Sequence, residues 1–252
     1  LIIISLLIGE RSNFIKVFII VNLYLIFVNE INLKLKISFF LILIISLVTF
    51  INFNQTYKSR YYDQIVEIFK KENNLKFINN SQYGAHYNVA KEIFLDNPFF
   101  GVGIKNFRAE SGSKKYDKLD HPKNASRVST HPHQVHYEFL SETGIFGYLT
   151  FLIFMIVSLI LSLKNYLKYK NNFQLASIII VFVSMLPLLP SGSIFSTFAG
   201  GLFWINYAIM VAYNKNKIKY LLFKLVKFIS NNINGNCCSL RFYRSEKNFH
   251  IY

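Results

Sequence analysis

The stretch GIFGYLTFLIFMIVSLILSL at residues 144–163 has no charged side chain over twenty consecutive positions. A helix rises 1.5 Å per residue, so this stretch spans about 30 Å, the thickness of the hydrocarbon core of a bilayer. Directly before it lies the polar sequence THPHQVHYE at residues 130–138. The sequence therefore predicts a membrane-spanning helix with histidines at its mouth, where titratable groups are costly and by default functional.

Further apolar stretches recur along the chain, which is 52% hydrophobic and contains 26 Phe among 252 residues. They lie at residues 1–8, 14–28, 37–51, 175–189 and 194–213. A soluble domain of this length would not carry so many long apolar segments. We therefore expect an all-α protein, a polytopic transmembrane helical bundle. The chain starts inside an apolar stretch, so we expect the first helix to be truncated and the chain to be the C-terminal part of a longer protein.

Lysines mark alternate connections between these stretches. They are Lys34 and Lys36, then Lys164, Lys168 and Lys170, then Lys215, Lys217 and Lys219. The positive-inside rule places such connections in the cytoplasm. The expected organisation is then transmembrane helices at 1–51, one large, partly helical periplasmic loop at 52–143, three transmembrane helices at 144–213 and a basic cytoplasmic tail at 214–252.

This topology explains much of the net charge of +15. No nucleic-acid-binding motif accompanies the basic residues, so nucleic acid is not an expected partner. In the tail, residues 217–230 carry apolar residues on one helical face and lysines elsewhere. This pattern predicts an amphipathic helix on the anionic membrane surface, so membrane lipids are an expected partner. An ordinary solvated helix is the alternative.

Inside the large loop, apolar residues recur at helical spacing near residues 62–69 and 87–94. We expect a helix at each place, the second ended by Asp96-Asn97-Pro98 because proline disfavours helical backbone in the residue before it. The next turn, at residues 98–103, contains Gly101 and Gly103. Glycines there allow a close approach to a ligand, and a plain turn is the alternative.

The histidine segment is the strongest candidate for chemistry. Pro132 is acceptable in the first turn of a helix and would set its start. A histidine, with an ordinary pKa of about 6.5, can accept a proton from a sugar hydroxyl, and His133 is the main candidate. For His131 and His136 a capping or water-exposed role is the favoured alternative. No metal is expected, because Pro132 constrains the ring directions and no acidic partner is evident.

Cations near the predicted outer surface are the second set of candidates. Arg11 and Lys16 lie at the expected outer end of two spans, where the topology rule does not favour positive charge. The planar fork of arginine suits phosphate oxygens, although pairing with Glu10 is an alternative for Arg11. Arg108 follows the glycine turn and precedes the histidine segment.

Three patches in this order resemble the C-terminal region of the O-antigen ligase family, which also contains O-antigen polymerases and protein O-oligosaccharyltransferases. They are the Arg11-Ser12 patch, the 96–108 patch and the patch from His131 to Gly147. The last matches the signature His-[Asn/Ser/Gln]-x9-Gly-x-x-[Gly/Thr/Tyr], with His133, Gln134, Gly144 and Gly147 at the specified positions. The motifs cover about residues 1–165.

The resemblance implies an inverting glycosyltransferase that needs no metal, nucleotide or other cofactor. Such an enzyme moves a glycan from undecaprenyl diphosphate to a hydroxyl acceptor, such as lipid A-core, at the periplasmic face of the bacterial inner membrane. It implies that His133 activates the acceptor and that Arg11 and Arg108 hold the diphosphate. The supporting candidates are His131, His136, Glu138 and Lys16.

Two alternatives stay open. A polymerase or protein O-oligosaccharyltransferase of the same family would differ in its acceptor. A lipid or polysaccharide transporter is an alternative of another class, although no internal repeat of the kind common in transporters is visible. If the transferase interpretation holds, Arg11, Arg108 and His133 should line one cavity within roughly 10–12 Å of one another, the room a diphosphate and one sugar need.

Overall fold

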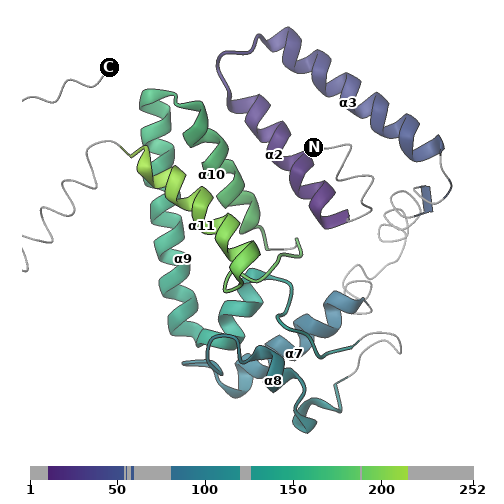
Figure 1. Ribbon diagram of the computed structural model, residues 1–252, viewed down its shortest axis with the longest axis vertical. Coiled ribbons are helices and arrows are strands. Elements are labelled where there is room, and N and C mark those ends of the chain that lie inside the picture. Colours follow the sequence, from purple (N-terminus) through teal and green to yellow (C-terminus); the bar gives the residue numbers. More distant parts are fainter. Residues whose placement is uncertain are drawn as a thin grey trace, which may run out of the picture. The chain divides into compact units, whose positions relative to one another are not determined.

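The computed structural model describes residues 11–53, 55, 58–59, 81–119, 126–187 and 189–214. Its main elements are α2 (Arg11–Phe27), α3 (Leu33–Phe53), α7 (Gln82–Asp96), α8 (Phe107–Ser111), the 3-10 helix η2 (Lys114–Tyr116), α9 (Val135–Tyr169), α10 (Asn172–Ser184) and α11 (Thr197–Ala212) (Figure 1). Within the described ranges there is no strand, so the expected all-helical class is confirmed there. The expected truncated span at 1–8, the helix near 62–69 and the tail helix at 217–230 lie outside the described residues.

Two of the described helices, α3 and α9, are long and apolar enough to cross a membrane. In α3 no position of the apolar stretch is buried by other parts of the protein, and in α9 only 17% of the stretch is buried. Helices α2, α10 and α11 are apolar but shorter, with 17, 13 and 16 residues. Each corresponds to a predicted span, and the full multi-span bundle stays a prediction.

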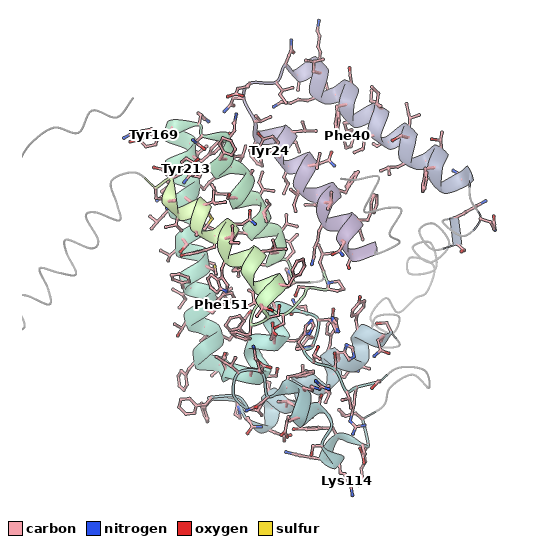
Figure 2. The ribbon with its side chains drawn as sticks, viewed as in Figure 1. Tyr24, Phe40, Lys114, Phe151, Tyr169 and Tyr213 are labelled. Carbon is pink, nitrogen blue, oxygen red and sulfur yellow. The ribbon has the colours of Figure 1, made fainter. Side chains whose placement is uncertain are left out.

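One apolar core joins α2, α9, α10 and α11. Figure 2 labels Phe151, a buried residue of α9 in this core, and Tyr24, a half-buried residue of α2 that packs against it. Polar side chains link the same helices: buried Gln174 donates to the Met210 carbonyl oxygen at 3.1 Å, and Tyr166 donates to the Phe27 carbonyl oxygen at 2.8 Å. These helices therefore form one unit, to which burial and hydrogen bonding both contribute.

A second, smaller core lies under α7, α8 and η2. Its buried members are Val89, Ala90, Ile93, Phe107 and Tyr116. Fully burying a side chain such as that of Ile93 or Phe107 stabilises by about 1.5–3 kcal/mol. The predicted helix near 87–94 and its end at Asn97 are confirmed, since α7 ends at Asp96 and Asn97 is its C-cap.

Helix α9 is bent at Gly144, whose φ of 65° and ψ of −170° lie outside the helical range. The bend leaves backbone groups of α9 without intrahelical partners, and the turn at residues 98–103 supplies them. The four hydrogen bonds run from Val102 N–H to the Ser141 oxygen (3.0 Å), Gly103 N–H to the Glu142 oxygen (2.8 Å), Ile145 N–H to the Pro98 oxygen (2.8 Å) and Phe146 N–H to the Phe99 oxygen (3.4 Å). Because unpaired buried backbone groups are costly, the turn and the bend stabilise each other.

Two glycines with positive φ make this docking sterically feasible. A Cβ on Gly144 would lie 2.4 Å from the backbone carbon and oxygen of Phe99. A Cβ on Gly101, whose φ is +66°, would lie 2.4 Å from the backbone carbon of Glu142. In this structure the close approach that Gly101 permits is therefore to the backbone of α9.

Replacing Gly144 with Ala should destabilise the protein strongly. The φ and ψ of Gly144 lie in a region that essentially only glycine adopts, where another residue costs about 1–3 kcal/mol, and the clash with Phe99 adds to that cost. Gly201→Ala is the matched control, since Gly201 lies inside α11 with no atom within 4 Å of its Cβ position. Alanine there should leave stability unchanged or raise it by about 0.5–1 kcal/mol. Thermal unfolding in detergent measures both, and similar melting temperatures for the two variants would contradict the docking argument.

Candidate functional site

The histidine segment meets α9 at a sharp change of backbone direction. Helix α9 begins at Val135, and its N-cap is Gln134, whose side-chain oxygen accepts from Tyr137 N–H at 2.9 Å. His133 has a φ of +58°, which a right-handed helix cannot include. The predicted helix start at Pro132 is therefore wrong: capping by Gln134 moves it to Val135. Strained backbone of this kind is concentrated at functional sites.

The rings of three histidines pack together. The ring centroid of His133 lies 4.1 Å from that of His131 and 5.1 Å from that of His86, and the edge of Tyr83 meets His133 at 5.7 Å. Ser129 Oγ lies 3.2 Å from His133 Nε2. His86 and Tyr83 come from α7, so that helix forms one wall of the site. Sequence reasoning missed both, because a single histidine in an amphipathic helix carries no pattern.

Gln82 fixes the position and the tautomer of His86. Its side-chain oxygen accepts from Ser126 N–H at 3.1 Å, and its Nε2 donates to the Ser126 carbonyl oxygen at 2.8 Å. The same Nε2 lies 2.9 Å from His86 Nε2. An amide nitrogen can only donate, so His86 Nε2 accepts and the neutral ring carries its proton on Nδ1. Gln82 thus holds the chain that leads into the histidine segment against α7.

The rings beside His133 resist protonation. Burial, with His133 nearby as a second cause, lowers the pKa of His86 and of His131 to about 4. Both flanking rings are therefore neutral at pH 7. Among the described residues, His86 Nδ1, His131 Nε2 and Ser191 Oγ are buried without a hydrogen-bond partner. Buried polar atoms without a partner are rare, and each needs an explanation such as a catalytic role or a bound water.

A short segment between α10 and α11 connects the histidines to α2. Ser191 N–H donates to the His133 carbonyl oxygen at 2.7 Å. The neighbouring Pro190 carbonyl oxygen accepts from the amine of Lys16, which is half-buried on α2. The histidine segment, this connection and α2 therefore lie in one chain of direct contacts. Sequence reasoning treated residues 190–193 as a plain connection, because no local pattern reveals such distant partners.

A cavity of about 330 Å³ opens beside this connection. Its polar lining consists of Lys16, Ser184, Ser191 and Asn206, and the rest is mostly apolar side chains of α10 and α11. Lys16 is the one charged residue among the described residues that line it. The cavity therefore combines an apolar wall with one cation and a few polar side chains.

Glu138 and His136 support the same connection from α9. Glu138 is 2% exposed, and its Oε2 accepts from Ile194 N–H at 3.1 Å. His136 uses both ring nitrogens: Nε2 lies 2.8 Å from the Met185 carbonyl oxygen, and Nδ1 lies 3.1 Å from the Tyr148 hydroxyl. Because a carbonyl oxygen can only accept, His136 Nε2 carries the proton. The contacts of both side chains hold α9 against α10 and α11.

Glu142, one helical turn after Glu138, has a comparable role toward α8 and was not among the predicted residues. Its carboxylate accepts from Lys105 N–H at 2.8 Å and from Phe107 N–H at 3.2 Å, which satisfies backbone donors at the start of α8. The sequence feature that could have identified Glu142 is its position one helical turn after Glu138.

The two predicted arginines lie on α8 and at the start of α2. Arg108 lies exposed on α8, next to buried Phe107. Arg11 is the first residue of α2, and its side chain lies outside the described part of the chain. The structure thus joins His131, His133 and Lys16 through neighbouring residues. The convergence of Arg11, Arg108 and His133 on one cavity stays a prediction.

The ring of His133 is stacked on that of His86 and tilted against that of His131. In the described part of the chain, no group of three or more His, Cys, Asp or Glu residues is arranged to hold a metal ion. The chemistry that this arrangement supports is proton transfer at a ring flanked by neutral neighbours.

Comparison with known proteins gives one family match. A family model described as O-Antigen ligase matches residues 1–152, which is more than half of the chain. The matched region includes Lys16, α7, α8 and the whole histidine segment. No curated protein matches the chain in sequence.

The contribution of His86 and His131 to stability should fall as the pH is lowered from about 6.5 to about 4. Within this pH range His86 and His131 are protonated in the unfolded chain but stay neutral in the folded protein. Their contribution to the free energy of unfolding therefore decreases as the pH falls. His86→Gln removes one of these groups and should make the fall less steep. Melting temperatures in detergent across this range provide the measurement. Parallel curves for the two proteins would show that His86 is not held neutral.

Proposed function

The chain belongs to the O-antigen ligase family, and on this premise we propose that it transfers a glycan from undecaprenyl diphosphate to a hydroxyl acceptor. The family implies a membrane-associated glycosyltransferase of the ligase or polymerase type that uses a lipid-linked glycan. We place the reaction at the periplasmic face of the bacterial inner membrane and choose lipid A-core, or a similar glycan, as the acceptor. The single observation that carries this proposal is the placement of His133 in the family-matched region, at the mouth of α9 and between neutral rings.

In the proposed reaction the acceptor oxygen attacks C1 of the donor sugar from the side opposite the diphosphate. A new C1–O bond forms, the bond from C1 to the diphosphate oxygen breaks, and its electron pair leaves with the diphosphate. A ring nitrogen of His133 takes the proton of the acceptor hydroxyl. The configuration at C1 inverts, and no step needs a metal. Because the rings of His86 and His131 are neutral at pH 7, neither places a positive charge beside His133.

The departing diphosphate needs positive charge nearby, and Lys16 is the best-placed candidate. An ammonium group has three N–H donors, and Pro190 uses one of them. The remaining donors can reach phosphate oxygens in the cavity, while its apolar wall accommodates the first part of the prenyl chain. We propose that Arg11 and Arg108 add their charge when the donor is bound. Such preorganised charge stabilises the transition state by several kcal/mol.

Replacing His133 with Ala should lower glycan transfer by about 10²–10⁴-fold, the contribution typical of a general base. The assay supplies membranes that contain the protein with a labelled undecaprenyl-diphosphate glycan. The product identifies the acceptor: labelled lipid A-core indicates a ligase, longer lipid-linked chains a polymerase, and labelled protein a protein transferase.

His136→Gln is the matched control for this variant. The ring of His136 contacts Met185 and Tyr148, so its loss should lower the melting temperature while transfer per folded molecule is largely kept. Normal transfer by His133→Ala, at equal amounts in the membrane, would refute the proposed role of His133.

Lys16→Met should raise the KM for the lipid-linked donor by about 10–100-fold, because a hydrogen bond to a charged group contributes about 1.5–3 kcal/mol. Lys36→Met is matched to it, since the Lys36 amine also donates to a backbone carbonyl, that of Ile26 at 3.1 Å. In both variants a backbone carbonyl oxygen loses its lysine donor, so an effect on folding alone would appear in both. An equal change in donor KM for the two would contradict a phosphate-binding role for Lys16.

A further inference from the structure

The turn after α7 exposes large apolar side chains that the transfer chemistry does not use. Phe99 is 59% exposed, Phe100 78% and Ile104 57%, and Phe146 beside them on α9 is 56% exposed. The ring centroids of Phe99 and Phe100 lie 5.9 and 5.8 Å from that of Phe146. We propose that this turn is a membrane anchor, whose side chains insert among the lipid acyl chains next to the mouth of α9. The proposal does not depend on the transfer reaction.

The exposed side chains are held in place by backbone contacts. Pro98 and Phe99 accept from Ile145 and Phe146, at the start of the apolar part of α9, and the left-handed Gly101 packs directly on α9. The phenylalanines are therefore presented from a fixed platform. A flexible surface loop would instead let large apolar side chains fold back onto the protein.

The exposed apolar surface that continues from the turn along α9 indicates what covers these side chains. Phe146, Leu149, Ile153 and Val157 recur at helical spacing on one face of α9, and all are between 44% and 61% exposed. An exposed apolar stripe of this length on a helix that can span a membrane faces lipid. Phe146 belongs to both the stripe and the cluster with Phe99 and Phe100. The cluster is thus the upper end of a lipid-facing surface, and acyl chains near the headgroups are its partner.

Polar residues directly follow the cluster in the chain. Lys105 and Asn106 directly follow Ile104 and are exposed. A lysine at this boundary can place its apolar stem along the cluster and its amine among phosphate headgroups. Apolar side chains below and a cation above are the order in which an interfacial segment meets a leaflet.

The single tryptophan of the chain, Trp204, makes a direct test available. Phe100→Trp in a Trp204→Phe background places one fluorophore on the turn. In vesicles of phosphatidylcholine its emission should be blue-shifted, strongly quenched by lipids brominated on the upper acyl chain, and little affected by aqueous iodide. Lys114→Trp in the same background is the control, since Lys114 is exposed on η2 (Figure 2). Its emission should be red-shifted and quenched by iodide.

Quenching of Phe100→Trp by iodide, to the extent seen for Lys114→Trp, would overturn the proposal. Blue-shifted emission that neither quencher affects would also overturn it, because it would mean that a second copy or another protein covers the turn. Ile104→Trp provides a second probe on the same turn and should give the lipid-quenched result as well. Loss of the folded state in one variant would leave the other to decide.

Discussion

The interaction on which the described structure depends is the backbone pairing between the 98–103 turn and the bend of α9. Bending a helix frees donors and acceptors that cannot stay unpaired in an apolar surrounding. Here the freed groups at Ser141, Glu142, Ile145 and Phe146 find partners in a turn some forty residues earlier in the chain. Both Gly101 and Gly144 are needed, because each lies against the backbone of the other segment.

This pairing decides where the candidate site can form. The bend separates the apolar part of α9 from a polar first part that carries two acids one helical turn apart. Glu142 accepts from backbone N–H groups at the start of α8, and Glu138 accepts from Ile194 N–H in the segment before α11. Helix α7 is tied to the first part through the turn, and it carries His86 to His133. Gly144, the signature glycine eleven positions after His133, therefore affects the site indirectly. Its bend gives the polar end of α9 an orientation that a straight helix would not have.

The described helices follow closely from local patterns in the sequence. The apolar stretch at 144–163 and the proline after Asn97 were enough to predict α9 and the end of α7. What could not be predicted are contacts between distant residues whose types are ordinary: Gln82 with Ser126, and Ser191 with His133. The N-cap at Gln134, and with it the helix start at Val135, was missed for a different reason, since glutamine is an uncommon cap and the proline nearby gave the stronger local signal.

The segment at residues 190–191 lies outside the family-matched region, yet it joins the two groups that the proposed chemistry needs. The Pro190 oxygen and the Ser191 N–H belong to the same peptide group: the oxygen accepts from the Lys16 amine, and the N–H donates to the His133 carbonyl oxygen. Any displacement of Lys16 toward a phosphate must therefore act on the same backbone that positions the base. Proline at 190 restricts φ to about −65°, which limits how far this backbone can turn in response. The distance between the Lys16 amine and His133 thus depends on the geometry of this one short segment. Glu138 holds the segment in place by accepting from Ile194 N–H.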